Sequence, residues 1–114
     1  MLPCSGSSNC GQIAYQVAVD LDVMGVGRLY CLAGLGAHIQ GMVASISDAK
    51  RIIAIDGCQV ACAKKTVEYA GLNVTDWVCV TDEGISKNHS ILLEQADVEL
   101  ITRKTMQLLL KSHK

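Results

Sequence analysis

Apolar residues recur every three or four positions in four stretches of the chain, as they do on the buried face of an amphipathic helix. The stretches cover residues 9–24, 39–46, 60–70 and 97–111. Asn9 and Gln12 resemble the capping box that begins many helices, and Gly25 follows the last apolar position of the first stretch. The pattern therefore predicts four helices, each with one face turned toward a core.

Short apolar runs between these stretches predict four strands, over residues 1–3, 28–31, 52–55 and 77–80. The third run is apolar at every position, which is typical of a strand covered by helices on both faces. Strands that alternate with helices indicate βαβ units and hence a mostly parallel sheet. We therefore expect an α/β fold, a small three-layer sandwich whose four-stranded sheet has the flavodoxin-like or Rossmann-like order 2-1-3-4.

The first predicted strand is short for a place inside the sheet. Only three residues precede Cys4, and Pro3 has no N–H to donate to a neighbouring strand. Either this strand is very short, or residues are missing upstream of Met1.

The composition narrows the class of protein. The chain has 114 residues, half of them apolar, which is enough for one domain over residues 1–114 with its own core. Its net charge of −1 and dispersed basic residues argue against nucleic acid or a membrane surface as partners. The N-terminus lacks the basic and apolar regions of a secretory signal, and no apolar run reaches the roughly 18 residues of a membrane span. We expect a cytoplasmic protein.

Six cysteines, at positions 4, 10, 31, 58, 62 and 79, carry the candidate chemistry. In a reducing compartment the alternatives are metal ligation, thiol chemistry and packing as small apolar residues. Cys4 and Cys31 end the first two predicted strands, Cys58 follows the third, and Cys62 lies one helical turn further. Because the carboxyl ends of parallel strands share one edge, where open α/β sheets bind ligands, we expect these four thiols to converge.

Four convergent thiolates suit a tetrahedral Zn²⁺ ion, and such a site usually has a structural role. Iron–sulfur ligation is less favoured, because the chain has no cysteine pair with ferredoxin spacing. Cys79, between two valines of the fourth predicted strand, is expected to be a core residue. Cys10, at the start of the first predicted helix, is a candidate fifth ligand, activated thiol or packing residue.

Three motifs resemble the DGC-domain family. They are C-S-G-S-S-N-C-G-Q at 4–12, C-L-A-G-L-G-A-H at 31–38 and I-D-G-C-Q-V-A-C-A-K-K at 55–65, and the resemblance extends over residues 4–71. The family is named for its Asp-Gly-Cys motif, here completed by Asp56 and Gly57. Its shared cysteines are regarded as zinc chelators, and its biochemical role is unknown.

The resemblance implies one zinc ion per chain, held by cysteines that coincide with the four thiols at the predicted strand ends: Cys4, Cys31, Cys58 and Cys62. Cys10 and Cys79 do not match the shared set.

Further polar residues lie near the predicted edge. Asp56 is a candidate for supporting a metal ligand by a hydrogen bond, for replacing one of the metal ligands, or for capping the next helix. Ser5 and Ser8 lie in a loop of small residues, which forms either an anion site or a tight turn. His38 begins the second predicted helix, as a proton carrier, an alternative ligand or a surface residue.

Three functions follow from these residues. The first is a zinc protein without catalysis of its own. The second is a thiol or redox enzyme in which Cys58 with Cys62, or Cys4 with Cys10, cycles between dithiol and disulfide. The third is a carrier of metal or sulfur that presents its cysteine edge to a small molecule or a protein partner.

Overall fold

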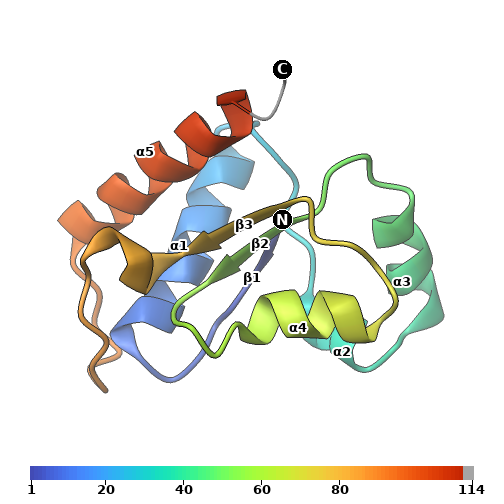
Figure 1. Ribbon diagram of the computed structural model, residues 1–114, viewed down its shortest axis with the longest axis horizontal. Coiled ribbons are helices and arrows are strands. Elements are labelled where there is room, and N and C mark those ends of the chain that lie inside the picture. The colour runs from blue at the N-terminus through green and yellow to red at the C-terminus, as the bar shows by residue number, and fades with distance from the viewer. Residues whose placement is uncertain (112–114) are drawn as a thin grey trace.

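The structure is a computed structural model that describes residues 1–111. Its sheet has three parallel strands in the order β1-β2-β3 (Figure 1). The strands are β1 (Leu2–Pro3), β2 (Ile53–Asp56) and β3 (Asp76–Cys79). All four residues of the central strand β2 are buried, as expected for a parallel strand covered on both faces. The α/β class and the parallel sheet are thus confirmed.

The prediction of four strands is wrong, because residues 28–31 do not form a strand. This segment still runs beside β1, since the N–H of Tyr30 donates to the carbonyl of Met1 (3.0 Å) and the Met1 amino group donates to the carbonyl of Arg28 (2.6 Å). β1 contributes only two residues, and Pro3 has no N–H to donate. The ladder is therefore too short to include a fourth strand, although the strands that do form keep their predicted order.

Residues 1–111 also form five α-helices and one 3₁₀-helix. They are α1 (Asn9–Val23), α2 (Leu32–Gly36), α3 (Gln40–Ser47), α4 (Cys62–Tyr69), η1 (Val80–Glu83) and α5 (Gln95–Lys111). The sequence pattern did not indicate α2. The predicted start of α4 at Val60 is wrong, because Ala61 has a left-handed backbone (φ +58°) and leaves Val60 55% exposed.

The start of α1 also differs from the prediction. Ser8, not Asn9, caps the helix, and its hydroxyl accepts the N–H of Gly11 (3.1 Å). The Asn9 side chain instead holds the loop after η1, donating to the carbonyl of Ser86 (2.9 Å) and accepting the N–H of Asn88 (2.8 Å). Gly25 ends α1 as predicted, with a positive φ of 78°.

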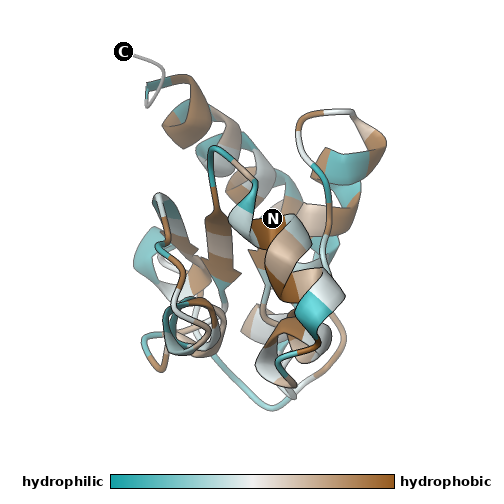
Figure 2. Cartoon of the chain, turned by 90° about the vertical axis from the view of Figure 1, so that its right-hand side faces the viewer, coloured by the Kyte–Doolittle hydropathy of each residue, from teal (hydrophilic) through white to brown (hydrophobic). Residues whose placement is uncertain are grey.

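The helices form a layer on each face of the sheet (Figure 1). α1 and α5 cover one face, with a core cluster that includes Ile13, Val17, Ile55 and Ile101. The helices α2, α3 and α4 lie on the other side, where the second cluster contains Leu2, Leu35, Ile46, Ile52 and Val67. Figure 2 shows the strands as a hydrophobic centre between these layers. Within residues 1–111, no helix is long and apolar enough to cross a membrane.

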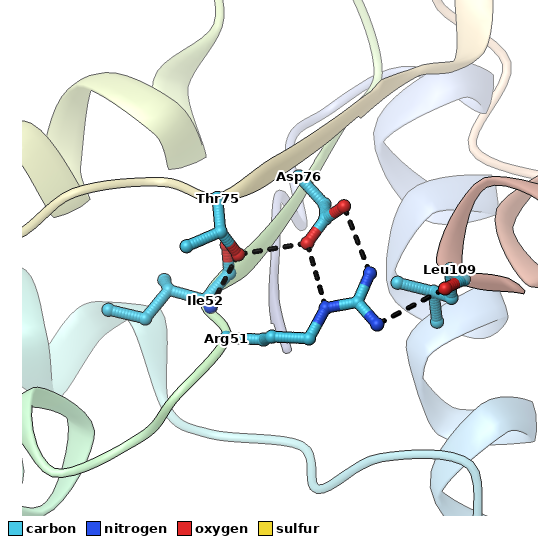
Figure 3. A network of polar contacts seen from close by, with 5 residues as sticks. All are labelled: Arg51, Ile52, Thr75, Asp76 and Leu109. Carbon is cyan, nitrogen blue, oxygen red and sulfur yellow. Dashed lines mark hydrogen bonds and ion pairs between the residues drawn. The ribbon is translucent and has the colours of Figure 1, made fainter. Parts of the chain in front are cut away.

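A polar network closes the amino-terminal edge of the sheet (Figure 3). The Arg51 guanidinium donates to both carboxylate oxygens of Asp76 (3.2 and 3.0 Å) and to the carbonyl of Leu109 (3.1 Å). The Thr75 hydroxyl also contacts the Asp76 carboxylate (2.8 Å). The network ties β2 and β3 to the end of α5.

We expect Arg51→Met to lower the free energy of unfolding by about 2 kcal/mol, since it removes the two hydrogen bonds of the guanidinium to the buried Asp76 carboxylate. The Asp76 side chain is only 3% exposed, whereas that of Arg51 is 26% exposed, which keeps the loss below that of a fully buried pair. Urea unfolding measures the effect. Lys104→Met is the matched control, because Lys104 pairs with Glu83 at 3.8 Å on the surface. Equal losses in the two variants would contradict a special role for Arg51.

Candidate functional site

A cavity of about 540 Å³ lies at the carboxyl edge of the sheet. Cys4 follows β1, Cys58 lies between β2 and α4, and Cys62 is the first residue of α4; all three line this cavity. Lys87 and His89, from the loop after η1, contribute to its wall. We call it the thiol cavity. Two other cavities of about 550 Å³ are lined in part by α5 and contain no cysteine.

Cys31, the fourth predicted ligand, lines a different cavity of about 350 Å³. Its side chain is exposed and caps α2, where the sulfur accepts the N–H of Gly34 (3.3 Å). Across the described residues, no three His, Cys, Asp or Glu side chains are arranged so that they could hold a metal ion. The structure therefore brings three of the four predicted ligands to one cavity and leaves Cys31 outside it.

Close glycine contacts hold the cysteine-bearing segments together. A Cβ atom on Gly57 would lie 2.7 Å from the backbone of Cys10 and Gly11, and one on Gly11 would lie 2.7 Å from the Gly6 nitrogen. Real Cβ atoms essentially never approach backbone atoms so closely. The turn that carries Cys58 is therefore packed directly on the start of α1, and the start of α1 is packed directly on the loop that follows Cys4. This contact places two separate segments on one cavity.

Asp56 has a structural role at this edge. It is 1% exposed, and its carboxylate accepts the N–H groups of Ala63 (2.7 Å) and Lys64 (3.0 Å) and the indole N–H of Trp77 (2.9 Å). The N-cap residue of α4, Ala61, has no side chain that can accept a hydrogen bond. Asp56 thus caps α4 from the end of β2, and its oxygens are occupied by these donors.

The cavity thiols have different surroundings. The sulfur of Cys4 accepts the N–H of Gly6 (3.3 Å). Burial raises the pKa of Cys4 above its ordinary value, the Gly6 N–H opposes this, and the nearby Asp56 carboxylate adds to it. The Lys87 ammonium lies 3.4 Å from the sulfur of Cys58 and donates a hydrogen bond to it.

The remaining cysteines are core residues. Cys10 is 0% exposed on the buried face of α1, in agreement with a packing role, and burial raises its pKa. Cys79 is buried at the end of β3, as predicted, and its sulfur contacts the side chains of Gln59 (3.5 Å) and Thr81 (3.4 Å).

Other predicted site residues lie outside the thiol cavity or serve the fold. Ser5 lines the same cavity as Cys31, whereas Ser8 lines the thiol cavity but caps α1. His38 has a positive φ of 58° and packs edge-on against Tyr69, with ring centres 5.1 Å apart. The sequence reasoning did not identify Lys87, although it follows the strand β3 and so belongs to the same edge.

The raised pKa of Cys4 predicts a specific labelling pattern in the reduced, metal-free protein. Alkylation requires the thiolate, so Cys4 should reach half of its maximal rate at a pH above the ordinary range for cysteine. Cys31 is the exposed comparison and should label faster at neutral pH. Mass spectrometry after timed iodoacetamide treatment across a pH series gives both rates. A Cys4 midpoint at or below the ordinary value would contradict the burial described above.

Comparison with known proteins agrees with the cysteine motifs. The DGC domain model matches residues 1–105, which is longer than the motif-bearing segment. A relative is the "Anaerobic and virulence modulator AnvM" of Pseudomonas aeruginosa strain PAO1, 29% identical over 96 residues that cover 84% of this chain and 73% of that protein. No solved structure shows a significant match. The family match extends over most of the chain, and the protein therefore belongs to the DGC domain family.

Proposed function

We propose that this protein binds zinc through the three cysteines of the thiol cavity. The observation that carries the proposal is that Cys4, Cys58 and Cys62, from two segments far apart in the sequence, line one cavity at the carboxyl edge of the sheet. Thiolates are preferred ligands of Zn²⁺ in proteins. The relative AnvM is described as a modulator, so we propose that metal binding serves regulation and not catalysis.

The residues fit the metal only in part. A single ion held by all four predicted ligands does not fit, because Cys31 lines a separate cavity. Cys4, Cys58 and Cys62 fit by chemistry and by location, and binding requires their side chains to turn toward a common point, since they are not arranged around one as they stand. Zinc would act as a redox-inert cross-link between the segment after β1 and the turn between β2 and α4.

A competition titration tests the proposal. Reduced, metal-free protein is titrated with zinc in the presence of a chromophoric chelator, for the wild type and for Cys58→Ser. We expect one zinc per wild-type chain and affinity weakened at least about tenfold in the variant. Cys79→Ala is the control, because it removes a buried thiol that does not line the cavity. No zinc binding in the wild type, or equal binding by Cys58→Ser, would exclude the proposal.

The contact between Lys87 and Cys58 favours a second candidate, thiol chemistry or sulfur transfer at Cys58. The predicted partners are less well placed for it. Cys58 precedes α4 and so does not share its helical spacing with Cys62, and Cys10, the predicted partner of Cys4, is fully buried. This candidate requires Cys58 of metal-free protein to alkylate more slowly in Lys87→Met than in the wild type. Unchanged rates would remove its support.

A further inference from the structure

We infer that a cavity at the amino-terminal edge of the sheet binds a small monocarboxylate with an apolar chain. The cavity has a volume of about 550 Å³ and is lined by residues at the starts of β1 and β2, by the loop after α1 and by the end of α5. We call it the arginine cavity, because Arg28 and Arg51 line it. It lies at the other end of the strands from the thiol cavity, so the inference is independent of zinc binding.

The walls of the arginine cavity are mostly apolar. Met1, Ile53 and Leu109 line it and are buried, whereas Val26 and Leu110 line it and are 39% and 70% exposed. Cavities of roughly 300–1,000 Å³ with apolar walls and a few polar groups are typical small-molecule sites. An apolar chain in this cavity would remove the two exposed side chains from water, which stabilises the complex.

Arg28 supplies the positive charge that a carboxylate needs. Its guanidinium lies 5.4 Å from the centre of the Tyr30 ring, and Tyr30 also lines the cavity. Stacking on an aromatic ring holds a guanidinium in place and leaves its N–H groups at the edge able to donate hydrogen bonds. Within residues 1–111, Arg28 forms no ion pair. Because one guanidinium can donate two parallel hydrogen bonds to one carboxylate, Arg28 suits a monocarboxylate.

Among the described residues, no acidic side chain lines the arginine cavity. Asp76 contacts Arg51 but forms a neutral pair with it, and the Arg51 guanidinium also donates to the carbonyl of Leu109 at the end of α5 (Figure 3). Asp22, in the last turn of α1, accepts the N–H of Leu29 (2.6 Å) and does not line the cavity. The charges of the surrounding segments therefore leave the cavity suited to an anion.

The neighbouring cavity has similar apolar walls and a different charge. It also has a volume of about 550 Å³ and shares Met106 and Leu110 with the arginine cavity. Asp20, Glu99 and Arg103 line it, and two carboxylates with one guanidinium give a net charge of −1. A carboxylate would be repelled there. An anionic ligand should therefore select the arginine cavity.

Calorimetric titration with octanoate tests the inference, with 1-octanol and octylammonium as comparison probes of the same chain length. We expect one octanoate per chain, with a dissociation constant below about 1 mM and at least about fivefold tighter binding than either comparison probe. Arg28→Met should weaken octanoate binding about tenfold without weakening the binding of 1-octanol. Arg103→Met is the matched control, because Arg103 is also an exposed arginine but lines the neighbouring cavity. It should bind octanoate like the wild type.

NMR of methyl-labelled methionines locates the bound octanoate. Met1 and Met106 line the arginine cavity, Met24 lines the neighbouring cavity, and Met42 lies in α3 against Gly34. Octanoate should shift the signals of Met1 and Met106 and leave those of Met24 and Met42 in place.

Four results would contradict the inference. Octanoate does not bind, or 1-octanol binds as tightly as octanoate. Octanoate shifts Met24 without Met1, which places it in the neighbouring cavity. The signals of Met1 and Met106 move with protein concentration alone, which shows that a second copy of the chain covers this face.

Discussion

Replacing Asp56 with alanine is expected to lower the free energy of unfolding by about 4 kcal/mol, since hydrogen bonds to a buried charged group are among the strongest single contributions. The carboxylate accepts three N–H groups, from Ala63, Lys64 and Trp77. The substitution would leave these donors without their acceptor in a site that is 1% exposed, and it would uncap α4. The Trp77 indole is a direct reporter, so urea unfolding followed by its fluorescence measures the loss.

Two further variants serve as comparisons for Asp56→Ala. Asp56→Asn keeps the size and one acceptor oxygen, so its loss should be about half as large. Asp48→Ala removes an exposed carboxylate after α3 and should change stability by less than about 0.5 kcal/mol. If Asp56→Ala were as stable as Asp48→Ala, Asp56 would not be the cap of α4. The alternative role of Asp56, in supporting or replacing a metal ligand, would then be favoured.

Gly57→Ala is expected to cost about 3 kcal/mol, at the upper end of the range for added atoms in a packed site. The new Cβ would lie 2.7 Å from the Cys10 carbonyl carbon and from the Gly11 nitrogen. Both are backbone atoms at the start of α1 and cannot move aside as a flexible side chain does. The turn must therefore shift away from α1, which also displaces Cys58 from the thiol cavity. Urea unfolding measures the cost, and zinc titration of the folded fraction measures the displacement.

Gly41→Ala separates the effect of the contact from the effect of any glycine substitution. Gly41 lies in α3 with no neighbouring atom within 4 Å of its Cβ position. Alanine is the better helix former, so this variant should be as stable as the wild type or up to about 1 kcal/mol more stable. A Gly57→Ala protein with wild-type stability would show that the two segments are not packed as described.

The regular parts of the fold could be predicted because their signals are local. The uninterrupted apolar run at Ile53–Ile55 marks a buried parallel strand, and Gly25 and Gly71 mark helix ends at positive φ. Residues 28–31 have the composition of a strand, but whether they pair depends on the length of β1, which is a property of their neighbour. The helix α2 was missed because two of its five residues are glycines, which disfavour helices unless tertiary packing holds them.

Part of the candidate site could also be predicted from the sequence. The rule that strand ends meet at one edge identified Cys4 and Cys58, which line one cavity. The rule does not distinguish between two cavities along the same edge, and Cys31 lines a different cavity from Cys4 and Cys58. Lys87 comes from a loop without a periodic pattern, so its approach to Cys58 is visible only in three dimensions.

The zinc content of protein purified without added metal tests the central claim most directly. Each chain should carry about one zinc ion, and that ion should be lost when Cys4, Cys58 and Cys62 are replaced together by serine. Quantitative elemental analysis against protein concentration gives the ratio. A wild-type ratio below about 0.2 zinc per chain, with all thiols free to react, would contradict the account.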